Sequence, residues 1–439
     1  MIAFVTLLLG LISGVYPIEV TVSGPVAAVE FTVDGAPAGR IDPIGKPPWV
    51  GRVDLGRGLR PRELVARALD AEGKEIARAS QWLNLPRPPA EVEIVLEREE
   101  GVPKAAVLTW QIVSGVKPAS VDLTLDGEPL KVDARGRAGL PPRDLKSLHV
   151  LTAELWFPPG LVARKDVAYG GEYGSEVSTE LTAVPVKVSP GTALPGPEGL
   201  QDWFFASGRP APVAAVEDGP GKVVIVRVPG ANEVLSKLLP PQQRSSLAPA
   251  FRRQMLLGEE DQVRFLSLSG NPFRNSRVPA ELFDMSPPLG RKDGGVFWYL
   301  TNTRMPVRKG AEQSLADAVA VAGLQATAEN RRRAVVLVLG NDAKDSSRYD
   351  PAAARAYLES IHVPLFVWSL YGTNSQAARA WGTPEEIEDI SNTAKLERAV
   401  ARLRAELDAQ KIVWIEGRHL PQAVTLSPSA QGVVLPGIR

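Results

Sequence analysis

Residues 222–232 read KVVIVRVPGAN, and this stretch decides which fold the second half of the chain is expected to have. The run 223–228 is apolar apart from Arg227, and Pro229-Gly230 follows it directly. A continuous apolar run that ends at such a turn is typical of a buried parallel strand. In an open α/β sheet, ligands bind at the edge where the parallel strands have their carboxyl ends. The sequence therefore places Arg227 where a binding site is expected.

Further strands and helices alternate after this stretch. Apolar strand patterns lie at 262–270, 295–303, 332–340 and 363–372. Helices are expected to begin at about Glu312, at Pro351 after the N-cap Asp350 and at Pro384 after Thr383, and a last one carries Leu396, Val400, Leu403 and Leu407. The alternation predicts an open α/β fold in which helices cover both faces of a parallel sheet.

The first half of the chain repeats one pattern. VEFTVDGAPAGRID begins at Val29, and VDLTLDGEPLKVD begins at Val121. In each copy, apolar residues alternate with polar ones before an Asp-Gly pair, which is typical of a half-buried strand that ends in a hairpin turn. The repeat predicts two β-sandwich modules.

The stretch ELVARALDAEGKEIARASQW, which begins at Glu63, has the composition of an amphipathic helix. We expect instead two strands around a turn at 70–73, because the flanking segments have strand patterns and Gly73 lies where a turn needs glycine. With this interpretation, residues of about 18–87 resemble a bacterial immunoglobulin-like domain of the kind found in tandem on exported proteins.

Joints rich in Pro and Gly divide the chain. LPRPPAE at 85–91 and VSPGTALPGPEGL at 188–200 have the composition of semi-rigid linkers. The division expected is a signal peptide or anchor at 1–16, immunoglobulin-like domains at 18–87 and 90–187, a linker at 188–212 and the α/β domain at 213–430.

The amino terminus, MIAFVTLLLGLISGVYPI, carries no charged side chain before Glu19. An apolar stretch of this length is short for a membrane span and long for a core strand, so it favours a secretory signal, cleaved near residues 14–17. We therefore expect an extracytoplasmic protein, in the periplasm, on the cell surface or secreted. A retained membrane anchor, a buried strand and a mis-assigned start are the alternatives.

The composition excludes several classes of site. Lys plus Arg and Asp plus Glu both number 50, which gives no reason to expect nucleic acid as a partner. The chain has no cysteine and three histidines far apart in sequence, which excludes disulfides, thiolate zinc sites and histidine clusters. No phosphate-binding glycine loop follows a strand, and no serine lies in a nucleophile elbow. We expect no cofactor and no enzymatic activity.

The α/β half resembles a von Willebrand factor type A domain, especially the exported acidobacteria-type variants that carry immunoglobulin-like modules ahead of it. The resemblance rests on SLADAVAVAGLQATAENRRRAVVLVLGNDAKDSSRYDPAAARAYLESIHVPLFVWSLYG and extends over about 213–430, including the tail IVWIEGRHLPQAV. It implies a divalent cation at the carboxyl edge of the sheet. In that family an Asp-x-Ser-x-Ser after the first strand, a Thr ahead of a central helix and an Asp after the fourth strand bind the cation.

This chain lacks those ligands. In the order of the motif, the residues that replace them are Arg227, Pro229, Ala231, Gln313 or Ser314, and Asn341. Mg²⁺ and Ca²⁺ need hard oxygen ligands, usually with at least one carboxylate. A fixed positive charge beside the site repels them as well. We therefore expect no metal at this edge.

Arg227 is expected to take the place of the cation by pairing with Asp342 or Asp345, and a solvated arginine at a strand end is the alternative. The loop NDAKDSS at 341–347 brings further polar residues to the same edge. A solvated loop is the plainer interpretation of it, and a displaced Ca²⁺ site is the other. The residues expected to bind a partner are Arg227, Asn341, Asp342, Asp345 and Ser346.

Together these features predict a non-enzymatic, exported interaction or structural subunit. Its expected architecture is two all-β immunoglobulin-like sandwiches followed by an α/β, Rossmann-like type A domain with a degenerate metal site. The partner is expected to be another protein, with association to the membrane or cell envelope as a further expectation. The alternative is a carbohydrate or cell-wall binding protein that uses Trp49, Trp82 or Trp156 on the sandwiches.

Overall fold

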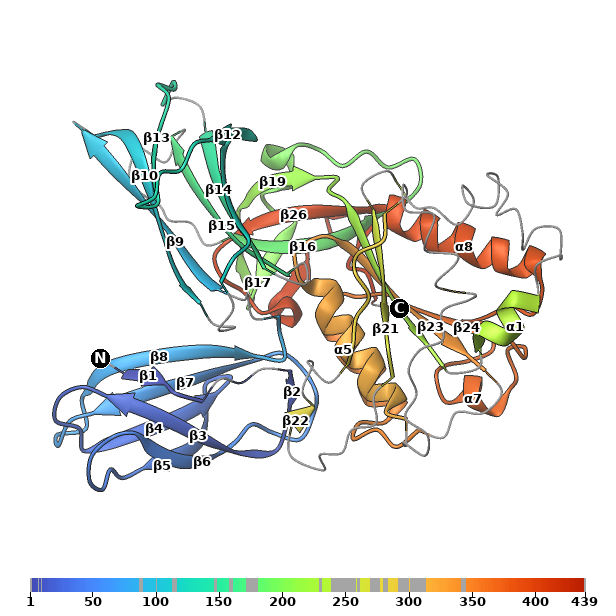
Figure 1. Ribbon diagram of the computed structural model, residues 1–439, viewed down its shortest axis with the longest axis horizontal. Helices are drawn as coiled ribbons and strands as arrows, with labels where there is room; N and C mark the ends of the chain where they lie inside the picture. The colour runs from blue at the N-terminus through green and yellow to red at the C-terminus, as the bar shows by residue number, and fades with distance from the viewer. Residues whose placement is uncertain are drawn as a thin grey trace.

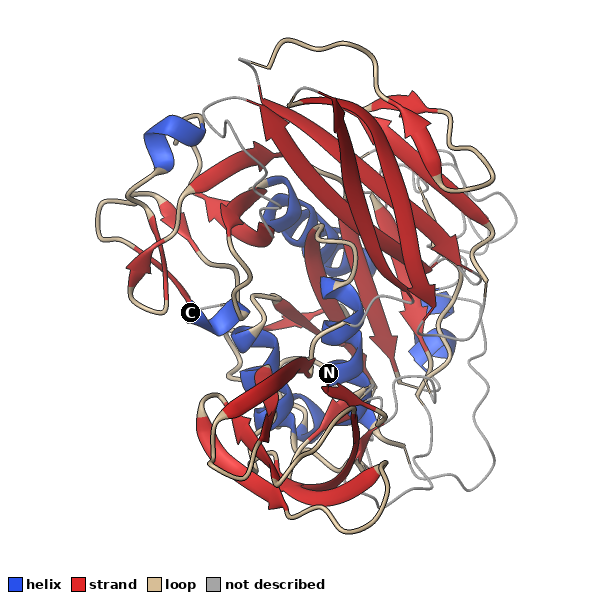
Figure 2. Ribbon diagram, turned by 90° about the vertical axis from the view of Figure 1, so that its left-hand side faces the viewer, coloured by secondary structure: helices blue, strands red, loops and turns tan. Residues whose placement is uncertain are grey.

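The fold is that of a computed structural model of the chain. The residues described are 2–6, 8, 10–86, 90–99, 101–112, 117–145, 148–157, 161–170, 181–228, 231–237, 258, 261–268, 277–278, 283–290, 300, 313–340 and 345–437. Strands make up most of the regular structure, and the chain forms several domains (Figures 1 and 2). Within the described residues, no helix is both long and apolar enough to cross a membrane.

The first module is a sandwich of two antiparallel sheets (Figure 1). One sheet has the order β1-β3-β6 and the other β5-β4-β7-β8. The strands are β1 (Ile2–Phe4), β3 (Val15–Val22), β4 (Ala28–Val33), β5 (Ala36–Ile41), β6 (Trp49–Asp54), β7 (Arg62–Leu69) and β8 (Glu75–Leu83). Alternate side chains such as Ile18, Val20 and Phe31 are buried in its core. β7 and β8 pair on either side of residues 70–73, which confirms two strands in place of a helix.

The apolar amino-terminal segment is part of this fold. β1 pairs with β3, and β2 (Leu11–Ile12) pairs with β22 (Arg277–Val278). Leu11 is buried in the core of the α/β domain, whereas Ile12 is buried in the core of the first module. Residues 2–4 and 11–12 are therefore strands of the folded chain, as in the buried-strand interpretation.

The second module is another sandwich of two antiparallel sheets. Their strand orders are β13-β10-β9 and β12-β11-β14-β15. The strands are β9 (Ala90–Glu99), β10 (Val102–Ile112), β11 (Ser120–Leu125), β12 (Glu128–Leu130), β13 (Arg137–Gly139), β14 (Leu148–Phe157) and β15 (Leu161–Gly170). The hairpins β4–β5 and β11–β12 turn at Asp34-Gly35 and Asp126-Gly127, so the repeat in the sequence is a repeat in the structure.

A third β unit includes the residues expected to form a linker. One sheet has the order β19-β26-β16-β28 and a smaller one has the order β18-β17-β27. The strands are β16 (Leu181–Val188), β17 (Phe204–Ala206), β18 (Arg209–Pro210), β19 (Val213–Glu217), β26 (Gln410–Glu416), β27 (Val424–Leu426) and β28 (Val433–Val434), with 3-10 turns η1 (Pro197–Leu200) and η4 (Pro421–Ala423). Leu200 and Phe204 are fully buried in its core. The structure therefore corrects the linker at 188–212 and the end of the second domain at 187, because these apolar side chains have a core of their own.

The α/β domain is inserted into this third unit, since the chain leaves it after β19 and returns at β26. The tail IVWIEGRHLPQAV was expected to belong to the α/β domain. It instead supplies β26, which runs antiparallel to both β16 and β19.

The α/β domain has a five-stranded parallel sheet with the order β21-β20-β23-β24-β25. The strands are β20 (Gly221–Arg227), β21 (Gln262–Leu266), β23 (Arg332–Leu339), β24 (Leu365–Ser369) and β25 (Ile387–Asp389), and the helices are α1 (Ala231–Lys237), α5 (Leu315–Thr327), α6 (Pro351–Ser360), α7 (Gln376–Arg379) and α8 (Thr393–Asp408). α5 packs against α6, and α8 lies on the opposite side of the sheet (Figure 1). The predicted parallel α/β fold is confirmed, while the strand expected at 295–303 falls outside the described residues except for Leu300.

The helix predicted to begin at Pro384 is not formed. Glu386 does accept a hydrogen bond from the Thr383 N–H at 2.9 Å, as in a helix-capping box. Glu386 also pairs with Arg355 of α6 at 2.9 Å, and Ile387 is buried. These tertiary contacts direct the chain into β25 after a single turn.

Candidate functional site

The carboxyl end of β20 is the topological switch point of the sheet. β21 lies on one side of β20 and β23 on the other, and in open α/β sheets the crevice at such a point is where ligands bind. β20 ends at Arg227. The amino end of α5 lies at the same edge, because the Leu315 N–H bonds to Asp345 in the connection after β23. The sequence prediction that Arg227 lies at the carboxyl edge of the sheet is therefore correct.

Arg227 is enclosed at this switch point. Its exposed fraction is 1%, and Nη1 donates a hydrogen bond to the Leu300 carbonyl. Burial lowers its pKa to about 10, which leaves the guanidinium charged at neutral pH. The solvated alternative is therefore wrong. A fixed positive charge lies at the strand end where the resembled family has a metal-binding carboxylate.

Asp345 caps the first turn of α5. Its carboxylate accepts hydrogen bonds from the N–H groups of Leu315 (2.9 Å), Ala316 (3.0 Å) and Ser347 (2.9 Å). A carboxylate is favourable there because the first N–H groups of a helix have no partner within the helix. The expected ion pair between Arg227 and Asp345, both of which the structure describes, is not formed. Arg227 donates to the Leu300 carbonyl, and Asp345 accepts N–H groups at the start of α5.

Of the remaining predicted residues, the structure describes some and leaves others outside the described ranges. Ser346 lies beside Asp345, and both its N–H (2.8 Å) and its hydroxyl (3.1 Å) donate to the Gln313 carbonyl. Ser314, the residue before α5, is fully buried. Asn341 and Asp342 lie outside the described residues. The structure thus brings Arg227, Asp345 and Ser346 to one edge.

Asp317 is a site residue that the sequence analysis missed. It lies in the first turn of α5, has no exposed surface, and accepts hydrogen bonds from the N–H groups of Arg348 (3.0 Å) and Tyr349 (3.1 Å). Burial raises the pKa of its carboxyl group. The signal was a single acid within the apolar stretch of 315–324. In the part of the chain that is described, no group of three or more His, Asp and Glu side chains is arranged to hold a metal ion.

Tyr371 adds an exposed aromatic ring to this edge, in the loop after β24. It is 49% exposed. The buried Ser369 hydroxyl donates to the Gly372 carbonyl at 2.7 Å and accepts from the Tyr371 N–H at 3.4 Å, and Gly372 has a φ of 80° that favours glycine. The turn that presents Tyr371 is therefore held by its own hydrogen bonds.

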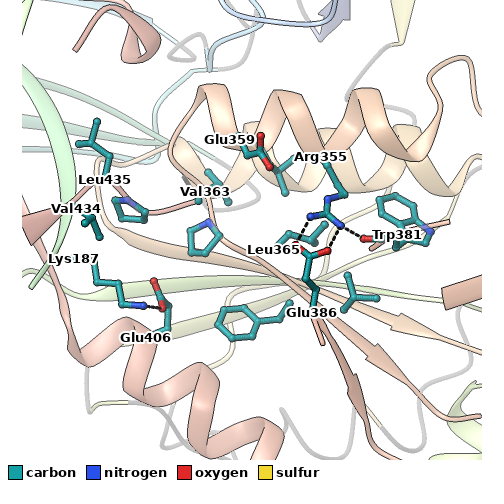
Figure 3. A pocket seen from close by; sticks show the side chains of 16 residues that line it. Lys187, Arg355, Glu359, Val363, Leu365, Trp381, Glu386, Glu406, Val434 and Leu435 are labelled. Carbon is teal, nitrogen blue, oxygen red and sulfur yellow. Dashed lines mark hydrogen bonds and ion pairs between the residues drawn. The ribbon is translucent and has the colours of Figure 1, made fainter. Parts of the chain in front are cut away.

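A pocket of about 180 Å³ lies away from this edge, at the amino end of β24 (Figure 3). Arg355 and Glu386 pair on one side of it at 2.9 Å, and Lys187 and Glu406 pair on the other at 2.5 Å. Ligand pockets usually enclose roughly 300–1,000 Å³. Four of the five charged side chains that line this pocket form these two ion pairs, and Glu359 is the fifth. The pocket is smaller than a usual ligand site, and most of its charge is neutralised within it.

Two of the three tryptophans expected to bind sugar are covered. The guanidinium of Arg418 lies 4.1 Å from the ring centroid of Trp82. Trp49 packs against the core of the first module, and Trp156 on β14 is partly buried. A sugar platform needs an open ring face, which Trp82 does not offer on the side of Arg418.

No protein-family model matches the chain, and no curated protein sequence does either. Among solved structures, proximal thread matrix protein 1 from the mussel byssus, with a zinc-occupied MIDAS motif, is similar over 44% of this chain and 47% of its own, at 11% identity and a TM-score of 0.30. Fibronectin(III)-like modules of Clostridium thermocellum CbhA are similar over 39% of this chain and 94% of theirs, at 16% identity and a TM-score of 0.16. The central fibronectin-III array of RIM-binding protein is similar over 45% and 83%, at 9% identity and a TM-score of 0.20. The chain thus spans about half of the mussel protein, and TM-scores this low assign no function.

Proposed function

We propose that this chain is a non-enzymatic protein that binds a protein partner without a divalent metal, at the carboxyl edge of its parallel sheet. The observation that carries the proposal is the burial of Arg227 at the switch point. A charged guanidinium at that position disfavours a cation by Coulomb repulsion at low local dielectric. Recognition at this edge then depends on side chains rather than on a metal that bridges two proteins.

The chemistry of the edge supports binding rather than catalysis. Ser347 is the serine paired with a carboxylate there, and its hydroxyl accepts from the Asp317 N–H and donates to Asp345. None of the three histidines of the chain follows a strand at this edge, since His362 precedes β24, His149 lies in the second module and His419 follows β26. The acceptor of the Ser347 proton is a carboxylate that also accepts backbone N–H groups of α5, and such a weakly basic group activates a serine poorly.

Thermal unfolding tests the absence of a metal. Melting curves in EDTA and in Mg²⁺, Ca²⁺ or Mn²⁺ should coincide, because a ligand raises the melting temperature only if it binds the native state. A rise in melting temperature with any one of these ions would contradict the proposal.

Co-purification from cell envelopes tests the protein partner. The full chain, tagged, should retain the same partner in EDTA and lose it when Tyr371→Ala removes the exposed ring from the edge. Val434→Ala is the matched control, because Val434 is exposed to a similar degree (51%) but lies on β28, outside the α/β domain. Loss of the partner in EDTA, or equal loss in both variants, would reject this edge as a metal-independent site.

Carbohydrate binding by the sandwiches is the weaker candidate, because Arg418 covers one face of Trp82 and Trp49 packs on a core. A glycan array probed with the full chain distinguishes the two functions. Binding that Trp156→Ala abolishes would favour the carbohydrate alternative.

A further inference from the structure

Residues 345–349, here called the cap loop, hold the first turn of α5 in place. Asp345 accepts the N–H groups of Leu315 and Ala316, and the Ser347 hydroxyl accepts the Asp317 N–H at 3.0 Å. The Asp317 carboxylate in turn accepts N–H groups from the end of the cap loop. The loop and the helix turn therefore satisfy each other's backbone groups.

The same loop binds the first module on its other side. The Tyr349 hydroxyl lies 2.9 Å from the Ser13 hydroxyl. Nη2 of Arg348 donates to both the carbonyl and the hydroxyl of Ser13, at 3.2 Å each. Ser13 is 3% exposed and Tyr349 8% exposed, so the contact between their hydroxyls is shielded from water. Arg348 is itself exposed, and its bonds to Ser13 are partly buried. Buried polar groups of this kind are costly to leave without a partner.

Ser13 has little freedom to move independently of its module. The adjacent Ile12 N–H donates to Asn84 Oδ1 at 2.7 Å. On the other side, Gly14 exchanges backbone hydrogen bonds with Gly56 (2.7 Å) and Leu55 (3.0 Å). A displacement of the first module therefore displaces Ser13 with it.

We propose that the cap loop couples docking of the first module to closure of the carboxyl edge. In the docked state, Ser13 holds Arg348 and Tyr349, whose N–H groups bond to Asp317, and Asp345 covers the first N–H groups of α5. In the undocked state, Ser13 releases these two residues, the cap loop loses its position, and the first turn of α5 opens. Because coupling between sites is reciprocal, a ligand that draws the cap loop away from α5 also loosens the first module.

This coupling concerns two parts of the same chain and does not depend on what the edge binds. It gives the first module a role other than that of a spacer. The module controls how far the N–H groups at the amino end of α5 are accessible.

Hydrogen exchange of the full chain tests the coupling. Ser13→Ala, a change within the first module, should speed exchange of the Leu315, Ala316 and Asp317 amides about threefold to tenfold, the range expected for loss of a shielded hydrogen bond. Tyr349→Phe should have the same effect, because it removes only the hydroxyl that bonds to Ser13.

Tyr357→Phe is the matched control. It also removes one buried tyrosine hydroxyl that bonds to the first module, at the Asn84 carbonyl (2.7 Å), but Tyr357 lies on α6 and not in the cap loop. It should speed exchange of the amides of residues 315–317 less than Ser13→Ala does, because the contacts of Ser13 with the cap loop stay in place. Equal acceleration in all three variants, or no acceleration in Ser13→Ala, would overturn the proposal.

A second experiment tests the coupling in the opposite direction, from the cap loop to the first module. Ser347→Ala removes the acceptor of the Asp317 N–H and should speed exchange of the Ile12 and Gly14 amides in the first module. Exchange at these two amides that stays at the wild-type rate would equally overturn the coupling. Melting curves of all four variants show that each remains folded under the conditions of exchange.

Discussion

Buried cations lie at both ends of the parallel sheet, and their surroundings differ. At the amino end, Lys222 is 1% exposed and pairs with Glu329 at 2.9 Å. Arg333 is 4% exposed, and its Nε donates to the His362 carbonyl at 3.4 Å. At the carboxyl end, Arg227 donates to a backbone carbonyl. Desolvation makes each of these charges sensitive to the exact partner it keeps.

Replacing Arg227 by Asp should destabilise the protein. The new carboxylate would face the Leu300 carbonyl, an acceptor that cannot donate to it, and a buried charge without a partner costs roughly 3 kcal/mol or more. Arg227→Met removes the charge as well as the hydrogen bond and should cost about 1 kcal/mol. Urea denaturation measures both. Equal losses for the two variants would mean that the buried charge at this position is unimportant.

Protonation of His362 should lower stability in mild acid. Burial, followed by the nearby Arg333 charge, lowers its pKa from 6.5 to about 4. Because the folded pKa lies below the unfolded one, the unfolded chain takes up the proton first as the pH falls. The contribution of His362 to the free energy of unfolding is therefore complete above about pH 6.5. It decreases by about 3 kcal/mol as the pH falls to 4.

Urea denaturation at a series of pH values measures how the free energy of unfolding depends on pH. His362→Asn is the comparison, because asparagine tolerates the positive φ of 54° at this position. The variant should be less stable at pH 7 through loss of the Nε2 hydrogen bond to Pro421 (2.9 Å), but its stability should depend less on pH between 6.5 and 4. The same slope in both proteins would assign the acid sensitivity to other groups.

The helices show where an N-cap residue in the sequence is enough to predict the start of a helix. Asp350 accepts the Ala353 N–H at 2.7 Å and begins α6 as its sequence predicts, and Asn392 accepts the Lys395 N–H at 3.0 Å and begins α8. The similar signal at Thr383 ends in one turn, because Arg355 holds Glu386 and the chain enters β25. A cap permits a helix, but burial and pairing of the following residues decide whether it continues.

Removing the cap of α6 should have a modest, measurable cost. Asp350→Ala leaves the Ala353 N–H without its side-chain acceptor and should lower the free energy of unfolding by about 1 kcal/mol. Asp350→Asn keeps an acceptor oxygen and should cost less. Chemical denaturation compares them, and an Asp350→Asn loss as large as that of Asp350→Ala would show that charge at the helix end, rather than the hydrogen bond, stabilises α6.

At the scale of the whole molecule, β26 joins the domains. It lies in the third β unit between β16 and β19, after the chain has returned from the α/β domain. Its Trp414 has the Arg164 guanidinium of the second module 5.8 Å from the ring centroid. Arg418, just after β26, lies over Trp82 of the first module. Segments remote in the sequence therefore meet around one strand.

The amino-terminal strands should contribute to global stability. Ile12→Ala should cost about 2–5 kcal/mol, since Ile12 is 1% exposed and lies in the core of the first module. Val5→Ala is the control, because Val5 is 45% exposed and its loss should change stability by less than about 0.5 kcal/mol. Denaturation of the intact chain measures both, and an Ile12→Ala variant as stable as the wild type would show that residues 1–16 are not part of the folded core.

The sequence by itself determined what depends on near neighbours. Alternation and the Asp-Gly pairs determined the repeated hairpins at Asp34 and Asp126, since the turn needs only two residues that tolerate positive φ. The apolar runs determined β20 and β23 as buried parallel strands. The first of these runs also placed Arg227 at the carboxyl edge of the sheet.

The tertiary structure decided what depends on distant residues. Proline and glycine content at 188–212 predicted a linker, but burial of Leu200 and Phe204 with β26, which comes some two hundred residues later, made a folded unit of it. Arg227 donates to the Leu300 carbonyl, and Asp345 accepts N–H groups from the amino end of α5. Each of these contacts forms because packing brings remote segments together and a buried polar group takes the partner that lies within reach, which no local pattern encodes.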